Sequence, residues 1–257
     1  GVSADPGLQT WTQRFIERAE FAGQSVATDR SPSMVTPGTT RVAGYERGIY
    51  RRDGDGTTAP GKEFFRKRLG EFAEIMNPKD YVCKMVQVGP TRLMLIMHRS
   101  YSHYLVEELR LFPQYDVSLE EMKNLKPDAI SFLGIPSKTV GEDYRIGYFL
   151  DEDSSGTALP VSWVDAENIT DYMGYLKKPV LTVANERVKA VGGLPVHGSA
   201  LTITAKNGLR KTVVMGGDSG TGKSETIIAM SNQIIGGMGG AQNIESVELL
   251  SGDMLSL

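Results

Sequence analysis

Eight consecutive residues have the types and spacing of a phosphate-binding loop. They are Gly217, Asp218, Ser219, Gly220, Thr221, Gly222, Lys223 and Ser224, which match the pattern G-x-x-x-x-G-K-[ST]. Glycines let a backbone curl until successive N–H groups converge on phosphate oxygens. Lys223 can reach the outer phosphates, and Ser224 can offer its hydroxyl to a divalent cation. The motif therefore predicts binding of ATP, or another nucleoside triphosphate, with Mg²⁺.

The sequence on either side of this motif supports the prediction. The strand-like run TVVM precedes the glycines, and the helix-like run ETIIAMSNQI follows Ser224. The N-terminal end of such a helix carries partial positive charge and free N–H groups, which favour an anion. A chance glycine-rich turn between a strand and a helix has no reason to place Lys223 and Ser224 at the helix start. Phosphate binding is therefore the favoured interpretation.

A hairpin is predicted directly upstream of the loop. Asn207-Gly208 stands between two apolar runs, ALTITA (200–205) and TVVMGG (212–217), and this dipeptide favours a type I′ turn. Such a hairpin places His197, near the start of its first strand, opposite the end of its second strand. His197 is therefore expected beside the phosphates. The alternative is a hydrogen-bonded histidine without a chemical role.

A carboxylate is expected at the end of the next strand. The run SVELLSGDML (246–255) is strand-like and contains Gly252-Asp253 near its end. From this position in nucleotide-binding folds a carboxylate commonly holds Mg²⁺. Asp253 is thus a candidate metal ligand and catalytic residue, with an ordinary turn aspartate as the alternative.

These features together resemble a known superfamily. A strand pair with His197-Gly198 at its start, then GDSGTGKSE, then an aspartate-bearing strand is similar to the P-loop superfamily that joins HPr kinase/phosphorylase to phosphoenolpyruvate carboxykinase. The loop, with Asp218 and with Ser-Glu after Lys223, resembles the HPr kinase version. His197-Gly-Ser-Ala200 resembles the carboxykinase His-Cys-Ser-Ala, and Lys177-Lys178 resembles the Lys-Lys-Gly site of the ATP-dependent carboxykinases.

The carboxykinase resemblance implies a metal site and a substrate. In that family the second lysine, the histidine and the aspartate hold the catalytic Mn²⁺, which implies that Lys178, His197 and Asp253 do so here. A lysine ligates a metal only when neutral, so burial and nearby positive charge would have to lower the pKa of Lys178. The alternative for the lysine pair is the solvated C-terminal end of a helix that stops before Pro179.

The sequence also departs from the carboxykinase pattern. In that family two aspartates follow the strand that corresponds to the run at 246–255, where this chain has Gly-Asp-Met. Arg30-Ser31-Pro32 resembles the family's N-terminal substrate motif, so Arg30 is a candidate ligand of a substrate carboxylate, although the residues that follow differ. The resemblance is firm over about 178–255 and does not extend through residues 40–170.

Three functions stay open at this point. The first is carboxykinase-like conversion of oxaloacetate and ATP into phosphoenolpyruvate, ADP and CO₂, with Lys223, His197 and Asp253 as catalytic residues. The second is an HPr kinase-like enzyme that phosphorylates a serine of a protein. The third is a non-catalytic nucleotide-binding regulatory module. The expected partner is accordingly a small dicarboxylate in the first case and a protein serine in the second.

The elements that must position these residues suggest an α/β protein with two domains. Residues 1–170 are expected to form a mixed α/β domain on the substrate side, and 171–257 a P-loop domain. A helix is expected over Lys62 to Met76, and strands are expected at 81–88, 92–98, 144–150 and 179–185, besides those named above. The P-loop domain is expected to be incomplete, because a sheet of this kind needs further strands after Asp253.

Composition narrows the partners and the compartment. The chain has 257 residues, of which 40% are hydrophobic and 23% charged, with a net charge of −3. Such a balance predicts a soluble protein with no electrostatic footprint for nucleic acid or for a membrane surface. Cys83 is the one cysteine, which excludes an internal disulfide and favours the cytoplasm. Cys83 itself is expected to be a small core residue.

Overall fold

The chain is a mixed α/β protein that divides into two compact units, Gly1–Val191 and Gly192–Leu257. The computed structural model describes residues 60–102, 112, 121, 124–141, 144–153, 155–167, 174–217, 221–235, 243–251 and 254–256. The domain boundary expected from the sequence lies between residues 170 and 171. Helix α7 (Gly174–Ala190) lies between that position and the division of the units, and it belongs to the first unit.

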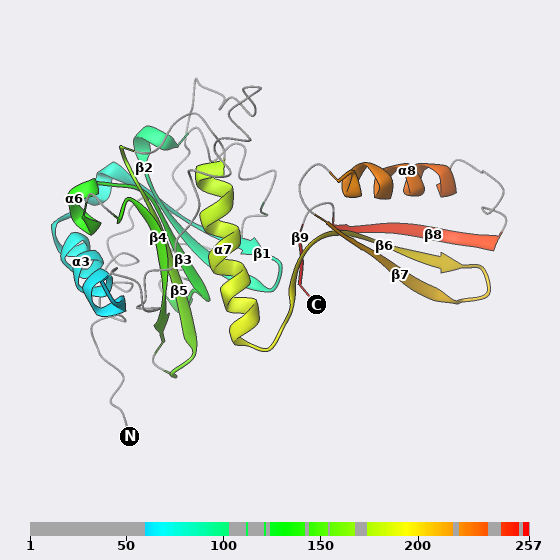
Figure 1. Cartoon of the computed structure of the whole chain (residues 1–257), viewed down its shortest axis with the longest axis horizontal. Helices are drawn as coiled ribbons and strands as arrows, with labels where there is room; N and C mark the ends of the chain where they lie inside the picture. Colours follow the sequence, from blue (N-terminus) through cyan, green and yellow to red (C-terminus); the bar gives the residue numbers. More distant parts are fainter. Residues whose placement is uncertain are drawn as a thin grey trace. The chain divides into compact units, whose positions relative to one another are not determined.

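A five-stranded sheet forms the centre of the first unit (Figure 1). Its strands are β1 (Tyr81–Val88), β2 (Thr91–His98), β3 (Ala129–Ile135), β4 (Ile146–Glu152) and β5 (Ala158–Asp165), in the spatial order β1-β2-β3-β5-β4. Strands β2, β3 and β5 run parallel, and β1 and β4 are antiparallel strands at the two edges. Short helical segments occur at η1 (Pro78–Asp80), η2 (Arg99–Tyr101) and α6 (Ser137–Val140).

Helices cover both faces of this sheet. Helix α3 (Lys62–Ile75) packs through Phe65, Leu69 and Phe72 into a core that includes Phe132 and Trp163. Helix α7 packs through Leu176, Val180 and Val183 into a separate core that includes Leu95 and Val164. Neighbouring strand residues point to opposite faces, so the sheet is buried on both sides, as a mostly parallel sheet requires. The first unit is therefore a three-layer arrangement with its own core.

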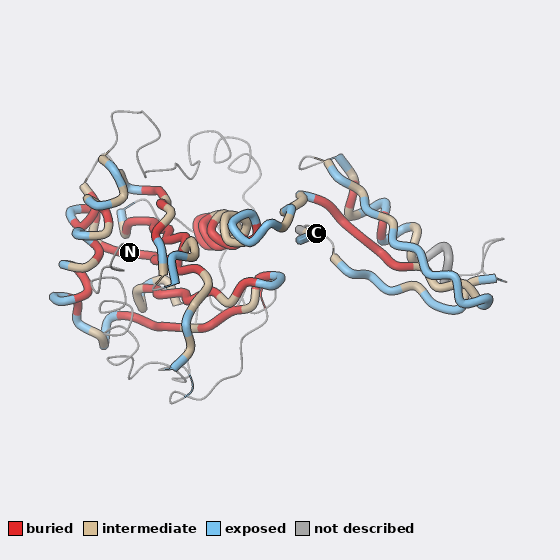
Figure 2. The backbone as a smooth tube through the Cα atoms, turned by 90° about the horizontal axis from the view of Figure 1, so that it is seen from below, coloured by how far each residue is buried: buried red, intermediate tan, exposed pale blue. Residues whose placement is uncertain are grey.

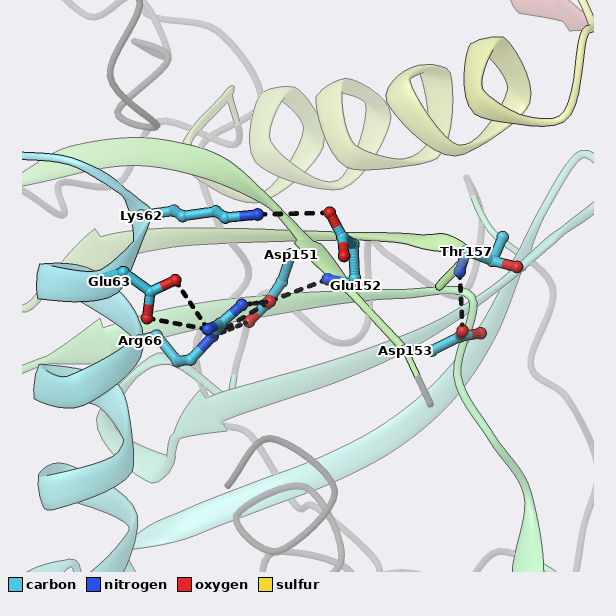
Figure 3. Close-up of polar contacts among 7 residues, drawn as sticks. All are labelled: Lys62, Glu63, Arg66, Asp151, Glu152, Asp153 and Thr157. Atoms are coloured by element: carbon cyan, nitrogen blue, oxygen red, sulfur yellow. Dashed lines mark hydrogen bonds and ion pairs between the residues drawn. The ribbon is translucent and has the colours of Figure 1, made fainter. Parts of the chain in front are cut away.

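An ion pair fastens helix α3 to strand β4 (Figure 3). Nε of Arg66 donates to both carboxylate oxygens of Asp151 at 3.1 Å, and the Asp151 side chain is fully buried. The same carboxylate accepts from the Glu152 amide at 2.8 Å. A second pair, Lys62 with Glu152, joins the same two elements at 3.3 Å but is exposed. The buried pair is the structurally important one, because unpaired burial of the Asp151 charge would be costly.

Most expected elements of the first unit are confirmed, and one is wrong. Helix α3 and strands β1, β2 and β4 lie at or close to their predicted ranges. Cys83 is fully buried in the core, where burial raises the pKa of its thiol to about 12. The run PVLTVAN (179–185), however, lies inside helix α7 and is not a strand. Strands β3 and β5 were not foreseen.

Helix α7 continues through Pro179 because its buried residues follow the helical period. Tyr175, Pro179, Val180, Val183 and Ala184 are all buried, and their spacing by three, four and five residues places them on one face. That face packs against the sheet. A proline inside a helix removes one backbone hydrogen bond, and burial of this face offsets the cost. Lys177 and Lys178 therefore lie within a helix and not at its C-terminal end.

In its described residues, the second unit is a small sheet with one helix. Its elements are β6 (Pro195–Ala205), β7 (Arg210–Gly216), α8 (Lys223–Ile235), β8 (Ile244–Ser251) and β9 (Met254–Ser256). Strand β6 lies between β7 and β8 and is antiparallel to both, so β7 and β8 run in the same direction. Figure 2 shows burial concentrated on β6, where Gly198 to Thr202 are all buried. The strands predicted at 200–205 and 212–217 are confirmed, and the run predicted at 246–255 contributes to two strands, β8 and β9, with residues 252–253 outside the described residues.

The hairpin between β6 and β7 is confirmed, but its turn differs from the expected type. A type I′ turn needs positive φ at both central residues, and among the described residues every positive φ belongs to a glycine. The Gly208 amide donates to the Ala205 carbonyl at 2.8 Å, and Gly208 has a φ of +83°. Ala205 and Leu209 therefore enclose a three-residue loop, a type I turn followed by a left-handed glycine. This loop shifts the strand pairing by one residue relative to the two-residue turn.

Candidate functional site

Strand β7, the glycine-rich loop and helix α8 follow one another as the sequence analysis expects. Strand β7 ends at Gly216, and α8 begins at Lys223. Strand β8 then returns parallel to β7, on the far side of β6. Parallel strands joined by a helix end at the same edge of their sheet. Gly217, which follows β7, and Met254, which comes after β8, accordingly both lie against His197 at this edge.

The described part of the loop is compact. A Cβ atom on Gly217 would lie 2.7 Å from Oγ1 of Thr221, so the Thr221 side chain packs directly over the Gly217 backbone. Gly222 has a φ of +79°, a conformation that other residues rarely adopt. The left-handed conformation therefore requires a glycine at position 222, whereas a side chain at position 217 would have to displace the Thr221 hydroxyl. This geometry turns the chain from the loop into helix α8.

The first turn of α8 is well formed at the loop. The Thr226 amide and hydroxyl both donate to the Gly222 carbonyl, at 2.9 and 2.7 Å. Lys223, the first helical residue, is 8% exposed, and Ser224 is half-buried. The early N–H groups of a helix lack carbonyl partners within the helix, and they can bind an anion. The arrangement is chemically suited to phosphate, with the amides as donors and Lys223 as the cation.

His197 lies between the two segments that follow β7 and β8. The Gly217 amide donates to the His197 carbonyl at 3.3 Å, and on the other side His197 pairs with Met254 of β9. Gly217 is the first residue of the loop motif, and Met254 directly follows Asp253. The expectation that His197 stands at the start of the loop is thus confirmed for its backbone. Its side chain is exposed.

Two neighbours of His197 have roles that the sequence analysis did not assign. The hydroxyl of Ser199, which is fully buried, lies 3.4 Å from the hydroxyl of Ser224 in the loop motif. A Cβ atom on Gly198 would lie 2.8 Å from the Met215 carbonyl oxygen, so β6 and β7 approach closely there. The sequence could have indicated that Ser199 lies near the loop, because it stands two residues after His197 and therefore on the same side of the strand. Which side carries α8 is known only from the fold.

The other candidate residues are distributed differently. Lys178 lies on helix α7 in the first unit, half-buried, and its carbonyl accepts from the Thr182 hydroxyl at 2.8 Å. Its convergence with His197 and Asp253 stays a prediction. Arg30, Asp218, Ser219, Gly220 and Asp253 lie outside the described residues.

The candidate metal ligands lie partly among the described residues and partly outside them. Within them, no three His, Cys, Asp or Glu side chains gather into a metal-binding group. The candidate ligands among the described residues are the Ser224 hydroxyl, an oxygen ligand that suits Mg²⁺, and the His197 imidazole, a nitrogen ligand that suits Mn²⁺ better than Mg²⁺; a carboxylate and phosphate oxygens would complete the set. Asp253 would be that carboxylate, because its chain neighbour Met254 pairs with His197.

No protein-family model matches this sequence, and a search of curated proteins finds no match either. Across the described part of the chain, no helix has both the length and the apolar character needed to cross a membrane. A function for the chain is therefore inferred from the residues of the loop and of its neighbouring strands.

Proposed function

We propose that the chain binds a nucleoside triphosphate with a divalent cation at the Gly217–Ser224 loop and transfers its terminal phosphoryl group. The position of His197 carries the proposal, because its backbone lies against both Gly217 and Met254. A chance strand–turn–helix would not need an imidazole at that point, next to the start of the loop and one residue from Asp253. The motif, the buried lysine and the parallel order of β7 and β8 support the same conclusion.

The reaction proposed first is carboxykinase-like. Oxaloacetate loses CO₂, the electrons of the broken C–C bond form an enolate, and the enolate oxygen takes the terminal phosphoryl group of ATP as ADP leaves. Lys223 and the loop amides would stabilise charge on the transferring phosphoryl group. His197, Lys178 and Asp253 would hold Mn²⁺, with Ser224 on Mg²⁺, and Arg30 would bind a substrate carboxylate. When bound, the metal ions supply charge neutralisation between the phosphoryl group and the enolate oxygen.

Phosphorylation of a protein serine is the second candidate, and Gly198 favours it. The carboxykinase pattern that this segment resembles has a cysteine after the histidine, whereas a side chain at position 198 would collide with the Met215 carbonyl. Asp218 in the loop also matches the kinase version of the motif. In that reaction Asp253 would accept the proton of the serine hydroxyl while the hydroxyl oxygen attacks the terminal phosphorus.

A pair of assays on the same preparation tests the proposal. Formation of ADP from ATP is measured with Mn²⁺ and oxaloacetate, with phosphoenolpyruvate as the second product. Phosphate transfer from labelled ATP to a protein serine is measured with Mg²⁺. Product in the first assay supports the carboxykinase reaction, and product in the second supports the kinase. Absence of both, with ATP binding intact, would refute catalysis and leave a nucleotide-binding module.

A further inference from the structure

The buried hydroxyl of Ser199 faces the loop residue that is expected to bind metal. Ser199 lies on β6, between His197 and Leu201, and its side chain is fully buried. Its Oγ lies 3.4 Å from Oγ of Ser224, which is the second residue of helix α8. The two serines are twenty-five positions apart in sequence, and the packing of α8 on β6 brings them together.

A serine that ligates a cation needs somewhere to direct its proton. A hydroxyl has one O–H donor and two lone pairs. When a lone pair of Ser224 binds Mg²⁺, its proton must point away from the ion, and an acceptor in that direction stabilises this orientation. Either hydroxyl of the 3.4 Å pair can donate, so the Ser199 oxygen can serve as that acceptor, and the Ser199 side chain has no surface exposed to water. Groups of this kind, behind the direct ligands, commonly tune metal affinity.

We propose that Ser199 is a positioning residue that accepts the Ser224 hydroxyl proton and so orients Ser224 for the divalent cation of a bound nucleotide. This inference rests on the proposed nucleotide site. It adds a residue that neither the loop motif nor the metal set contains. Ser199 acts through Ser224 and contacts neither the nucleotide nor the metal. Its effect should therefore be confined to the metal-dependent part of nucleotide affinity.

The test compares nucleotide binding with and without Mg²⁺ in the full chain. Calorimetry gives the dissociation constants for ATP alone and for Mg-ATP, and their ratio is the strengthening of nucleotide binding by the metal. Ser199→Ala is expected to reduce that strengthening by about tenfold, with affinity for ATP alone changed less than about twofold. Ser199→Cys fills nearly the same volume but accepts hydrogen bonds poorly, so it should resemble Ser199→Ala. Thr202→Val is the matched control, because Thr202 is buried on the same strand and its hydroxyl pairs with that of Thr212 at 2.9 Å.

Each outcome decides the inference. If Ser199→Cys restored the Mg²⁺-dependent affinity, the effect would come from packing, and the proposed role of Ser199 would be wrong. An equal loss of affinity for ATP alone and for Mg-ATP would also overturn that role. In a Ser224→Ala background, Ser199→Ala should add nothing further, and an additive loss would also overturn it. A native chain that binds neither ATP nor Mg-ATP would instead refute the proposed function itself. Native-like binding in Ser199→Ala would refute only the role of Ser199.

Discussion

The Gly217 amide donates a hydrogen bond of 3.3 Å to the carbonyl oxygen of His197. This contact joins the first glycine of the loop motif to the start of β6, and it is the last link of the β6–β7 hairpin. On the other side of β6, His197 pairs with Met254, which follows Asp253. One strand end thus brings together three segments that are well separated in sequence. Their chemistry is expected to depend on this one register.

Lys223→Ala is expected to remove most of the affinity for ATP while leaving the fold intact. The substitution deletes the cation of the loop motif, and charge-assisted hydrogen bonds of this kind contribute roughly 1.5–3 kcal/mol each. We therefore expect a loss of about 10- to 100-fold in ATP affinity by calorimetry, with an unchanged circular dichroism spectrum. Lys211→Ala is the control, since Lys211 is an exposed lysine on β7. Equal affinity in Lys223→Ala and native protein would contradict the phosphate role.

Gly198→Ala is expected to destabilise the second unit, because its new Cβ would lie 2.8 Å from the Met215 carbonyl oxygen. Forcing β7 away should cost about 1–3 kcal/mol, as overpacking commonly does. Gly216→Ala is a matched control, since Gly216 pairs directly with Gly198 and a Cβ there meets nothing within 4 Å. Chemical denaturation of both variants measures the difference. Equal stability of the two would show that the strands separate there without cost.

Arg66→Met is expected to cost about 3–5 kcal/mol of unfolding free energy, because it leaves the buried Asp151 carboxylate without its guanidinium partner. Lys62→Met removes the neighbouring pair with Glu152, which is exposed and should contribute at most about 1 kcal/mol. Urea denaturation followed by circular dichroism compares the two variants. A similar cost for both would mean that water reaches Asp151 once Arg66 is removed.

The sequence predicts the second unit better than the first, for physical reasons. Strands β6 and β7 show apolar alternation on either side of Asn207-Gly208, and the loop motif predicts a strand before it and a helix after it. The turn type was wrong because Asn-Gly also fits a three-residue loop with the glycine alone in the left-handed region. Helix α7 was missed because PVLTVAN is rich in β-favouring residues and begins with proline. Its helical state is decided by burial against the sheet, which is a tertiary effect.

The position of Ser199 could not be foreseen because it depends on which face of β6 carries α8. The strands β3 and β5 were missed for a related reason. β3 is buried at every residue and β5 at nearly every one, so neither shows the alternation that marks a half-exposed strand. Continuous apolar runs of that length do not distinguish a strand from a buried helix.

Asp218→Leu is expected to separate the two candidate reactions. In the carboxykinase-like reaction no acid is needed at this loop position, so activity with oxaloacetate should stay within about threefold of the native value. In the kinase-like reaction the loop would lose an acid typical of that branch, and serine phosphorylation should fall by at least about tenfold, the lower range for a catalytic proton-transfer group. Glu245→Gln is the control, because Glu245 is an exposed acid on β8, outside the loop motif. Collapse of a carboxykinase activity in Asp218→Leu would contradict the tolerance expected of that branch.

The last prediction concerns Lys178, His197 and Asp253, which the carboxykinase-like reaction requires on one Mn²⁺ ion. Titration of bound Mn²⁺ by electron paramagnetic resonance measures the site directly, without turnover. In the carboxykinase-like reaction, His197→Gln and Asp253→Asn should each weaken Mn²⁺ binding by at least about tenfold, because loss of a direct ligand should exceed the 10- to 100-fold effect of an outer partner. Lys178→Met should do the same only in the carboxykinase-like reaction. Lys189→Met is its control, as an exposed lysine of the same helix. Native Mn²⁺ affinity in Lys178→Met, together with a loss in His197→Gln, would exclude the lysine from the site and would leave serine phosphorylation or a non-catalytic nucleotide-binding module.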